Sequence, residues 1–278
     1  MVGFLLTILA SFLAESSTSI GKAEIKSKKE SILSFMFLNL FFVFILFLAI
    51  AIINPASFIF SFKSLPTFSL RVILELLQTY IAIKAIATAD RTTFSFIRTI
   101  TIPLLLLVDV ILGYALSLNQ ILGVSILFIA LLLSFVDHSI KKKGLWLVLF
   151  TAVNSVATIS LYKYNITHFN SFIAEQLVIT FFVIGVALIA LIIKEKKNPF
   201  KLLLKKPFFF QSFLQGAAAI VESLAYTFLP ASIVVAIARA SGMIWSTVSG
   251  RVYFKEKHIL HKFAIVAIII VGFVFLIK

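Results

Sequence analysis

The stretch SILSFMFLNLFFVFILFLAIAII, residues 31–53, determines the solvent of this protein. It contains no charged residue, and a helix of about 20 apolar residues is long enough to cross the hydrocarbon core of a bilayer. Nine further apolar segments flank it, at residues 3–20, 67–86, 93–112, 119–137, 145–164, 170–193, 207–228, 232–254 and 259–277. The pattern predicts an all-α integral membrane protein with ten transmembrane helices.

The composition agrees with a lipid environment. The chain has 278 residues, of which 61% are hydrophobic and only 13% charged, too little polar sequence to cover a water-soluble surface. The longest predicted connections, residues 54–66 and 194–206, cannot hold a soluble catalytic domain. Because the chain has no cysteine, disulfides, thiolate metal sites and cysteine nucleophiles are excluded.

The basic residues alternate between the gaps separating these segments. Of the 25 lysines and arginines, 18 fall in the first, third, fifth, seventh and ninth connections. They are Lys22, Lys26, Lys28, Lys29, Arg91, Lys141, Lys142, Lys143, Lys194, Lys196, Lys197, Lys201, Lys205, Lys206, Arg251, Lys255, Lys257 and Lys262. The even connections hold only Lys63. Because basic loops stay on the cytoplasmic side, we expect cytoplasmic odd connections and both termini outside. The net charge of +14 is then a topology signal, and we expect no nucleic-acid partner.

Two parts of the chain resemble each other. Residues 90–98 and 231–239 each place an arginine, Arg98 or Arg239, near the start of an apolar helix that is followed by a turn and one more helix. We therefore expect one membrane domain made of two five-helix repeats, residues 1–140 and 141–278. An odd number of helices per repeat inverts the second copy across the bilayer, as in many transporters with a substrate site between the repeats.

Charged and polar side chains inside the predicted helices mark the candidate site. An ionised side chain at the bilayer centre costs about 2.5 to 3.5 kcal/mol, so these groups should face an interior cavity. Their helical spacing groups them into polar stripes. Thr7, Ser11, Glu15 and Ser19 recur every four residues on the first helix, and Gln215, Glu222 and Tyr226 share one face of another. The candidate substrate-binding or coupling residues are Glu15, Glu75, Gln78, Arg98, Asn154, Gln215, Glu222, Tyr226, Arg239 and Trp245.

The embedded arginines allow two interpretations. They could form structural ion pairs, Arg98 with Glu75 and Arg239 with Glu222, or bind an anionic substrate group by bidentate hydrogen bonds. Trp245 could line a cavity or fill space. We predict no metal site, because the best-spaced histidines, His258 and His261, are interpreted as a surface pair at a helix end.

Helix 232–254 also carries small residues at four-residue spacing: Ala238, Gly242, Ser246 and Gly250. Such a stripe lets another helix approach closely, either within the bundle or in a dimer.

The residues from Leu229-Pro230-Ala231-Ser232 through Trp245 to Phe254-Lys255-Glu256-Lys257 resemble the drug/metabolite transporter superfamily, in particular its ten-helix EamA-type members. The first half is similar in residues 85–103 and 113–123, but Tyr114 stands where the family usually has glutamate. Ala14-Glu15-Ser16-Ser17-Thr18 also resembles the first helix of small multidrug resistance proteins, which would make Glu15 a coupling carboxylate. The resemblance implies export or exchange of small metabolites by alternating access.

The sequence thus predicts a secondary transporter, not an enzyme, that moves a small polar or zwitterionic metabolite such as an amino acid across the cell membrane. The arginines suit an anionic group and the glutamates a cationic one. We expect no cofactor, because the chain lacks a glycine-rich phosphate loop; a proton or counter-substrate would couple transport. The alternatives are a channel, a non-transporting membrane scaffold and, with less support, an intramembrane enzyme.

Overall fold

The computed structural model describes residues 1–26, 31–88, 97–133, 144–196, 198–254 and 259–277, and within them it is helical without a β-strand. Side chains are not described at residues 21–26, 32, 83, 86, 87, 243, 246–254, 259–263, 266 and 277. The long helices are α1 (Val2–Lys26), α2 (Ile32–Ile53), α3 (Leu65–Thr88), α7 (Leu145–His168), α8 (Phe172–Glu195), α10 (Lys206–Phe228), α11 (Ala231–Phe254) and α12 (Ile259–Ile277). The shorter ones are α5 (Thr101–Ile111), α6 (Leu118–Leu133), α9 (Phe200–Leu203) and two 3-10 turns, η1 (Pro55–Ser57) and η2 (Phe62–Ser64).

In the part of the chain that the structure describes, six segments are long and apolar enough to cross a bilayer. Five lie in α1, α2, α7, α8 and α10, and the sixth, Pro55–Ala82, runs from η1 into α3. Shorter apolar helical segments occupy residues 101–111, 118–133, 231–242 and 267–276. The prediction of an all-α integral membrane protein is confirmed. The number of ten spans stays a prediction.

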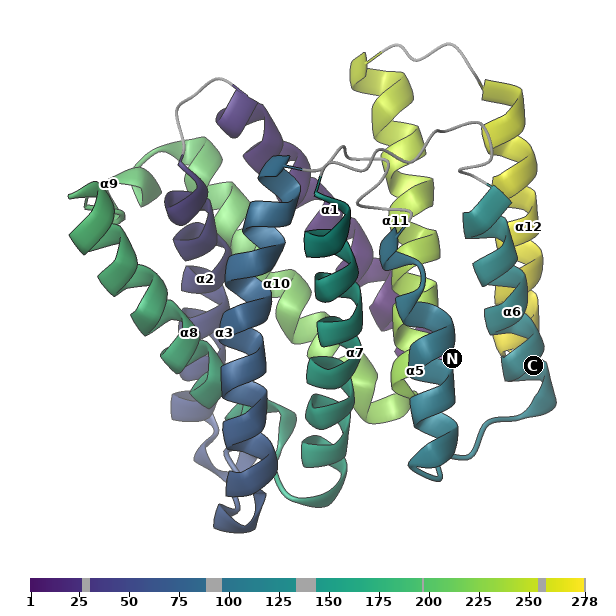
Figure 1. Cartoon of the computed structure of the whole chain (residues 1–278), viewed down its shortest axis with the longest axis horizontal. Coiled ribbons are helices and arrows are strands. Elements are labelled where there is room, and N and C mark those ends of the chain that lie inside the picture. Colours follow the sequence, from purple (N-terminus) through teal and green to yellow (C-terminus); the bar gives the residue numbers. More distant parts are fainter. Residues whose placement is uncertain (27–30, 89–96, 134–143, 197, 255–258, 278) are drawn as a thin grey trace.

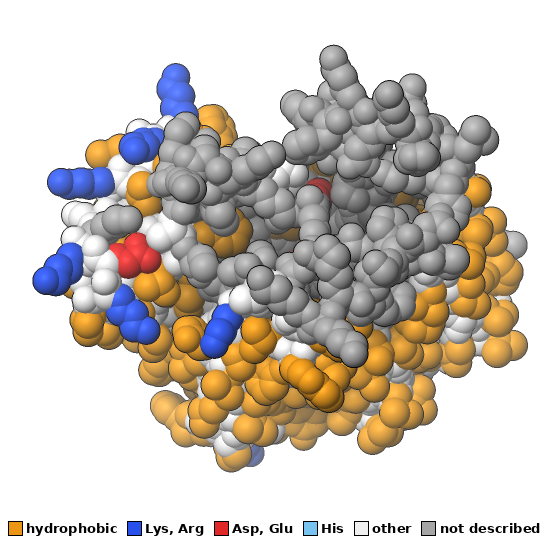
Figure 2. Space-filling model, turned by 45° about the horizontal axis from the view of Figure 1, so that its top comes forward, with side chains coloured by type: hydrophobic (Ala, Val, Ile, Leu, Met, Phe, Trp, Pro, Cys, Tyr) orange, Lys and Arg blue, Asp and Glu red, His pale blue; other side chains and the backbone are white. Residues whose placement is uncertain are grey.

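The flank of the bundle is apolar (Figure 2). Large side chains such as Leu9, Ile73, Phe181, Ile193 and Val271 are exposed there. A soluble protein rarely exposes so much contiguous apolar surface, whereas lipid chains solvate it.

Successive helices run in alternating directions (Figure 1). The turns joining α2 to α3, α5 to α6, α7 to α8 and α10 to α11 lie at one end of the bundle, where both termini also lie. The opposite end carries a group of exposed basic side chains, part of which Figure 2 shows; it includes Lys194, Lys196, Lys201, Lys205 and Lys206. The exposed lysines of the connection from α8 to α10 thus gather at the end of the bundle opposite the termini.

Most helices pack on partners far away in the sequence. Helix α1 packs on α10 and α11, α2 on α8 and α10, and α3 on α7 and α8. Helix α5 packs on α7 and α11, and α6 packs on α12 (Figure 1). Helices from the first and second halves of the chain thus pack against each other in a single bundle.

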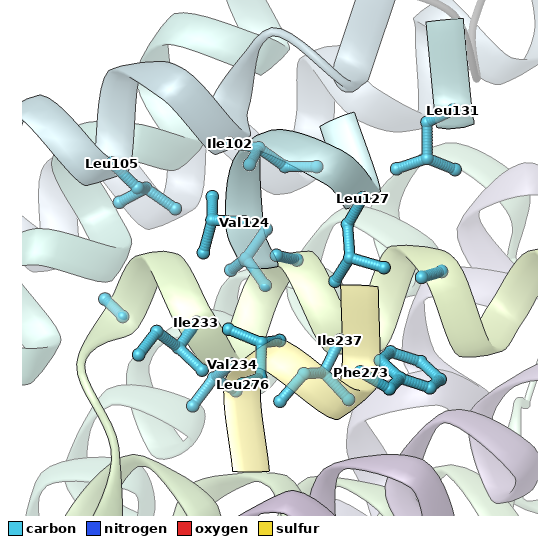
Figure 3. Packing of buried hydrophobic residues seen from close by; sticks show 14 of the residues in the cluster. Ile102, Leu105, Val124, Leu127, Leu131, Ile233, Val234, Ile237, Phe273 and Leu276 are labelled. Carbon is cyan, nitrogen blue, oxygen red and sulfur yellow. The ribbon is translucent and has the colours of Figure 1, made fainter. Parts of the chain in front are cut away.

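The largest apolar cluster joins α5, α6, α11 and α12 (Figure 3). Ile102 and Leu105 from α5 lie over Val124 and Leu127 of α6, with Ile233 of α11 on the other side. All five side chains are buried. Lipid offers little hydrophobic drive for helix association, so close van der Waals packing of this kind carries much of the stability.

Glycines permit the closest helix contacts. A Cβ on Gly216 of α10 would lie 2.7 Å from the backbone carbon and oxygen of Phe42 on α2. On α6, a Cβ at Gly123 would lie 2.8 Å from Leu276 and 3.0 Å from the carbonyl oxygen of Gly272, both on α12. Small residues thus bring α2 to α10 and α6 to α12.

Two embedded charges hold the corner between α10 and α11. The Asp109 carboxylate on α5 accepts a hydrogen bond from the Ser232 backbone N–H in the first turn of α11, at 2.7 Å. The Lys163 ammonium on α7 donates to the carbonyl oxygen of Tyr226 in the last turn of α10. An anion at a helix N-terminus and a cation at a C-terminus both complement the helix dipole. Asp109 therefore stabilises the start of α11, and Lys163 stabilises the end of α10.

Candidate functional site

A polar cavity of 270 Å³ lies among α3, α7, α8 and α10; we call it the central cavity. It is lined by Arg71, Glu75, Gln78, Arg98, Ser155, Thr158, Ile159, Tyr162, Gln176, Ala219, Glu222, Ser223 and Tyr226. Two carboxylates and two guanidinium groups thus share one small space. That combination can hold positive and negative groups of a ligand together.

Regular helix spacing builds the walls of this cavity. Residues at i, i+3, i+4 and i+7 lie on one face of an α-helix. Helix α7 contributes four lining residues at this spacing, and so does α10; they are Ser155, Thr158, Ile159 and Tyr162, and Ala219, Glu222, Ser223 and Tyr226. Helix α3 contributes Arg71, Glu75 and Gln78 at i, i+4 and i+7. Three local sequence patterns therefore converge on one place.

The carboxylates of Glu75 and Glu222 line the cavity without a fixed partner. Neither forms a hydrogen bond or an ion pair with any residue in the described ranges. The Glu222 carboxylate interacts electrostatically with Arg239 and Arg98, and the Glu75 carboxylate with Arg71. Both side chains are half-buried and line the cavity, so their carboxylates are accessible to a ligand, a proton or water.

Arg71 is held in place by a buried ion pair. Its Nη1 lies 2.8 Å from Oε1 of Glu175 at the start of α8, and both side chains are almost fully buried. Glu175 also accepts hydrogen bonds from the Nδ2 atoms of Asn165 and Asn170, at 2.8 Å and 2.5 Å. The guanidinium of Arg71 stacks on the Tyr162 ring, 4.5 Å from its centroid. Arg71 is thus a fixed positive charge in the cavity wall, and Glu175, which does not line the cavity, neutralises it.

A chain of amides joins α3 to α7 at one side of the cavity. The Asn154 Nδ2 donates to Oε1 of Gln78, at 2.9 Å, and to the backbone oxygen of Leu74, also at 2.9 Å. The Gln78 Nε2 donates to the hydroxyl of Ser155 at 2.7 Å. Both amide groups are engaged within the protein, so their first role is to lock these two helices together.

A second cavity of 210 Å³, which we call the side cavity, adjoins the first. It lies among α2, α3, α8 and α10 and is lined by Asn39, Leu40, Val43, Glu75, Gln176, Ile179, Thr180, Val183 and Gln215. Glu75 and Gln176 line both cavities. These two side chains therefore form the boundary between the cavities.

The structure brings together only part of the predicted site. Glu75, Gln78, Arg98, Glu222 and Tyr226 line the central cavity. Gln215 lines the side cavity, and Asn154 lies behind Gln78. The remaining three predicted residues, Glu15, Arg239 and Trp245, line neither cavity.

Each of these three has another place. Trp245 packs edge-on against Phe12 of α1, with ring centroids 4.9 Å apart. Glu15 lies half-buried on α1, whose predicted polar stripe faces protein: the Ser11 hydroxyl donates to the backbone oxygens of Thr7 and, on α11, Ala238. Arg239 influences Glu222 only through electrostatics.

Of the two interpretations of the embedded arginines, the ion pairs of Arg98 with Glu75 and Arg239 with Glu222 are not formed, because neither glutamate has an ion pair with a described residue. Arg71 forms a buried ion pair with Glu175, and the sequence analysis missed it. Its signal was available: Arg71 is an arginine inside an apolar helix, four residues before Glu75 and seven before Gln78, hence on the same face. The partner on α8 could not be chosen without the fold.

The predicted small-residue stripe on α11 contributes less than expected where it is described. An added Cβ at Gly242 would meet no atom within 4 Å. Helix α11 approaches α1 at Ala238, whose carbonyl oxygen accepts a hydrogen bond from Ser11 at 3.3 Å. The side chains of Ser246 and Gly250 lie outside the described part of the chain.

No family model matches the chain, and no curated protein matches it either. The site must therefore be interpreted from its own chemistry. No group of three or more metal-ligating side chains occurs among the described residues.

Proposed function

We propose that this protein is a secondary transporter that moves a small zwitterionic metabolite of the amino-acid class across a cell membrane by alternating access. The observation that carries the proposal is the central cavity, where carboxylates and guanidinium groups face one another inside an apolar bundle. Embedded charges are expensive in a membrane and are usually retained for function.

The charges in and around the cavity favour a neutral ligand with both signs. Arg71 is balanced by Glu175. Among the described residues, Glu75 and Glu222 balance Arg98 and Arg239 in formal charge, and Asp109 balances Lys163. A zwitterion leaves this balance unchanged, whereas an anion or a cation would need a compensating proton or ion. The cavity volume of 270 Å³ lies just below the range of about 300 to 1,000 Å³ typical of sites for drug-sized ligands.

The packing of the helices supports two inverted repeats, residues 1–140 and 141–278. Exchanging α1, α2, α3, α5 and α6 with α7, α8, α10, α11 and α12 turns the contact of α1 with α10 into that of α7 with α3. It also turns α2 with α10 into α8 with α3, and α1 with α11 into α7 with α5. The contacts of α2 with α8, α5 with α11 and α6 with α12 map onto themselves. All of these contacts occur, as expected for a pseudo-two-fold axis in the membrane plane.

This arrangement also favours ten spans, with odd connections on the cytoplasmic side and both termini outside. The described lysines at one end of the bundle support that orientation. The central cavity takes residues from both proposed repeats, as alternating access by rocking of one repeat against the other requires. Kinship with the EamA-type drug/metabolite transporters is part of the proposal, and it would agree with each of these features.

A non-transporting scaffold or a channel is the second candidate. A scaffold would be expected to pair its embedded charges, as Arg71 and Glu175 do, since an unpaired buried charge lowers stability. Unpaired Glu75 and Glu222 speak against it. An intramembrane enzyme would need a nucleophile with an adjacent base, and none of the cavity-lining residues forms such a pair.

The test is uptake of radiolabelled amino acids into proteoliposomes, with and without a pH gradient. We expect saturable uptake by the wild type and at least about a tenfold loss of kcat/KM in Glu75→Gln, since a lost charge contact costs about 1.5 to 3 kcal/mol. Lys63→Gln, which removes an exposed charge in a loop, is the control and should behave as wild type. Absence of saturable uptake of every amino acid by folded protein would contradict the proposal and favour the scaffold.

A further inference from the structure

The side cavity has the make-up of a binding pocket for a neutral, amphipathic group. One part of its wall is apolar, with Leu40, Val43, Ile179 and Val183. Another part carries amide side chains. Apolar walls with a few placed polar groups are typical of small-molecule sites.

Two of those amides have no hydrogen-bond partner among the described residues. The side chains of Asn39 on α2 and Gln215 on α10 form no hydrogen bond with any residue in the described ranges, in contrast to the engaged amides of Gln78 and Asn154. An amide offers both donors and an acceptor, and these two half-buried amides line the side cavity. The unpaired amides therefore point to a hydrogen-bonding ligand group between α2 and α10.

The position of Glu75 connects the side cavity to the central one. Its carboxylate lines both spaces and is a site for a ligand ammonium group. A ligand bound there can extend in two directions, toward the arginines of the central cavity and toward the amides of the side cavity. An α-amino acid branches in this way at its Cα atom.

We propose that the side cavity binds the side chain of the transported amino acid and selects a neutral one with an apolar stem and a hydrogen-bonding tip, such as that of glutamine. This inference rests on the proposed function and specifies its substrate class. The ammonium group lies at Glu75 and the carboxylate points into the central cavity. Gln176, which also lines both cavities and donates to the hydroxyl of Ser223 at 3.2 Å, closes the other side of the branch point.

The same wall excludes charged side chains. Among the described residues, no lysine or arginine lines the side cavity, so the carboxylate of a glutamate side chain would find no counter-charge from them and would be repelled by Glu75. An alanine side chain leaves the amides unsatisfied. A site built to hydrogen-bond a ligand group discriminates strongly against analogues without it.

The test compares uptake of L-glutamine, L-alanine and L-glutamate in proteoliposomes by wild type, Leu40→Phe and Ile45→Phe. Leu40 lines the side cavity, whereas Ile45 lies on another face of α2 and lines neither cavity. Filling the side cavity should raise the KM for glutamine relative to that for alanine by about tenfold or more. The Ile45→Phe control should keep the wild-type ratio. Leu40→Ala, which enlarges the cavity, serves if Leu40→Phe does not fold; it should shift preference toward larger neutral side chains.

Each outcome decides between the two levels of the proposal. If Leu40→Phe, or Leu40→Ala in its place, leaves the ratio of the KM values for glutamine and alanine as in wild type, the proposed role of the side cavity is wrong. The proposal of a transporter is then unaffected. A wild-type preference for glutamate over glutamine would also contradict the proposed role of the side cavity, but not the transporter proposal. If the wild type takes up no amino acid at all, both proposals fail.

Discussion

The buried pair of Arg71 and Glu175 permits a quantitative test of how the cavity wall is held. Glu175→Gln keeps the shape of the side chain but removes its charge and turns one carboxylate oxygen into a donor. In the wild type, each carboxylate oxygen accepts a hydrogen bond, one from Asn165 and the other from Asn170. Asn170 cannot turn its amide over without loss, because its Oδ1 accepts from the Ser61 backbone N–H at 2.8 Å. Glu175→Gln therefore leaves a buried cation without its counter-charge and sets donor against donor.

Removing one partner of a buried ion pair costs about 3 to 5 kcal/mol, and we expect about 4 kcal/mol for Glu175→Gln because three hydrogen bonds converge on this carboxylate. Arg71→Met should cost a similar amount, since it leaves Glu175 buried and charged. The double variant should cost about 2 kcal/mol less than the sum of the two, because it leaves no unpaired charge.

The assay is unfolding of the detergent-solubilised protein by stepwise addition of sodium dodecyl sulfate, followed by circular dichroism. Gln176→Leu is the comparison, because the hydrogen bond from Arg71 Nη2 to Oε1 of Gln176 is long, at 3.4 Å, and therefore weak. We expect that variant to lower the free energy of unfolding by less than about 1.5 kcal/mol. If Glu175→Gln destabilises by under about 1 kcal/mol, or if the double variant equals the sum, the pair does not hold the wall as described.

Two further predictions concern the scaffold. Gly216→Ala places a Cβ 2.7 Å from backbone atoms of Phe42, which cannot rotate away, so we expect a loss of about 1 to 3 kcal/mol in the same unfolding assay. Gly242→Ala, where nothing lies within 4 Å, should instead stabilise helix α11 by about 0.5 to 1 kcal/mol; equal effects at both glycines would contradict the close packing of α2 on α10. Asp109→Ala removes the carboxylate that accepts from Ser232 and should cost about 0.5 to 2 kcal/mol, whereas Asp109→Asn keeps the cap at little cost. An equal loss in both variants would show that charge, not capping, matters there.

Periodic patterns in the sequence predict the helices well. Residues 31–53 have no charge to place in water, so the start and end of α2 (Ile32–Ile53) follow closely from composition. The spacing of Gln215, Glu222 and Tyr226 also predicts correctly that this face of α10 lines the cavities. Local periodicity fixes which face of a helix is polar.

Partner choice between helices depends on the fold, and here the sequence misleads. The stripe that contains Thr7, Ser11 and Glu15 has the same polarity as that of α10, yet the hydroxyls of Thr7 and Ser11 bond to their own helix at 2.8 Å. Serine and threonine can satisfy themselves on the preceding turn, so they mark a cavity far less specifically than a carboxylate or an amide. Arg71 was overlooked beside Arg98 although the two are chemically equal, because only the packing of α3 on α8 brings Glu175 to it.

The central claim, that the substrate occupies the central cavity, can be tested directly because the chain has no cysteine. Ser223→Cys introduces one thiol into the cavity wall, and Ser117→Cys introduces one at an exposed position in the turn before α6. The rate of modification by a small methanethiosulfonate reagent is measured with and without the transported amino acid. At ten times its dissociation constant, the substrate should slow labelling of the Ser223→Cys variant by about tenfold and leave the Ser117→Cys variant unchanged. Equal labelling of the Ser223→Cys variant with and without a saturating transported substrate would contradict the account.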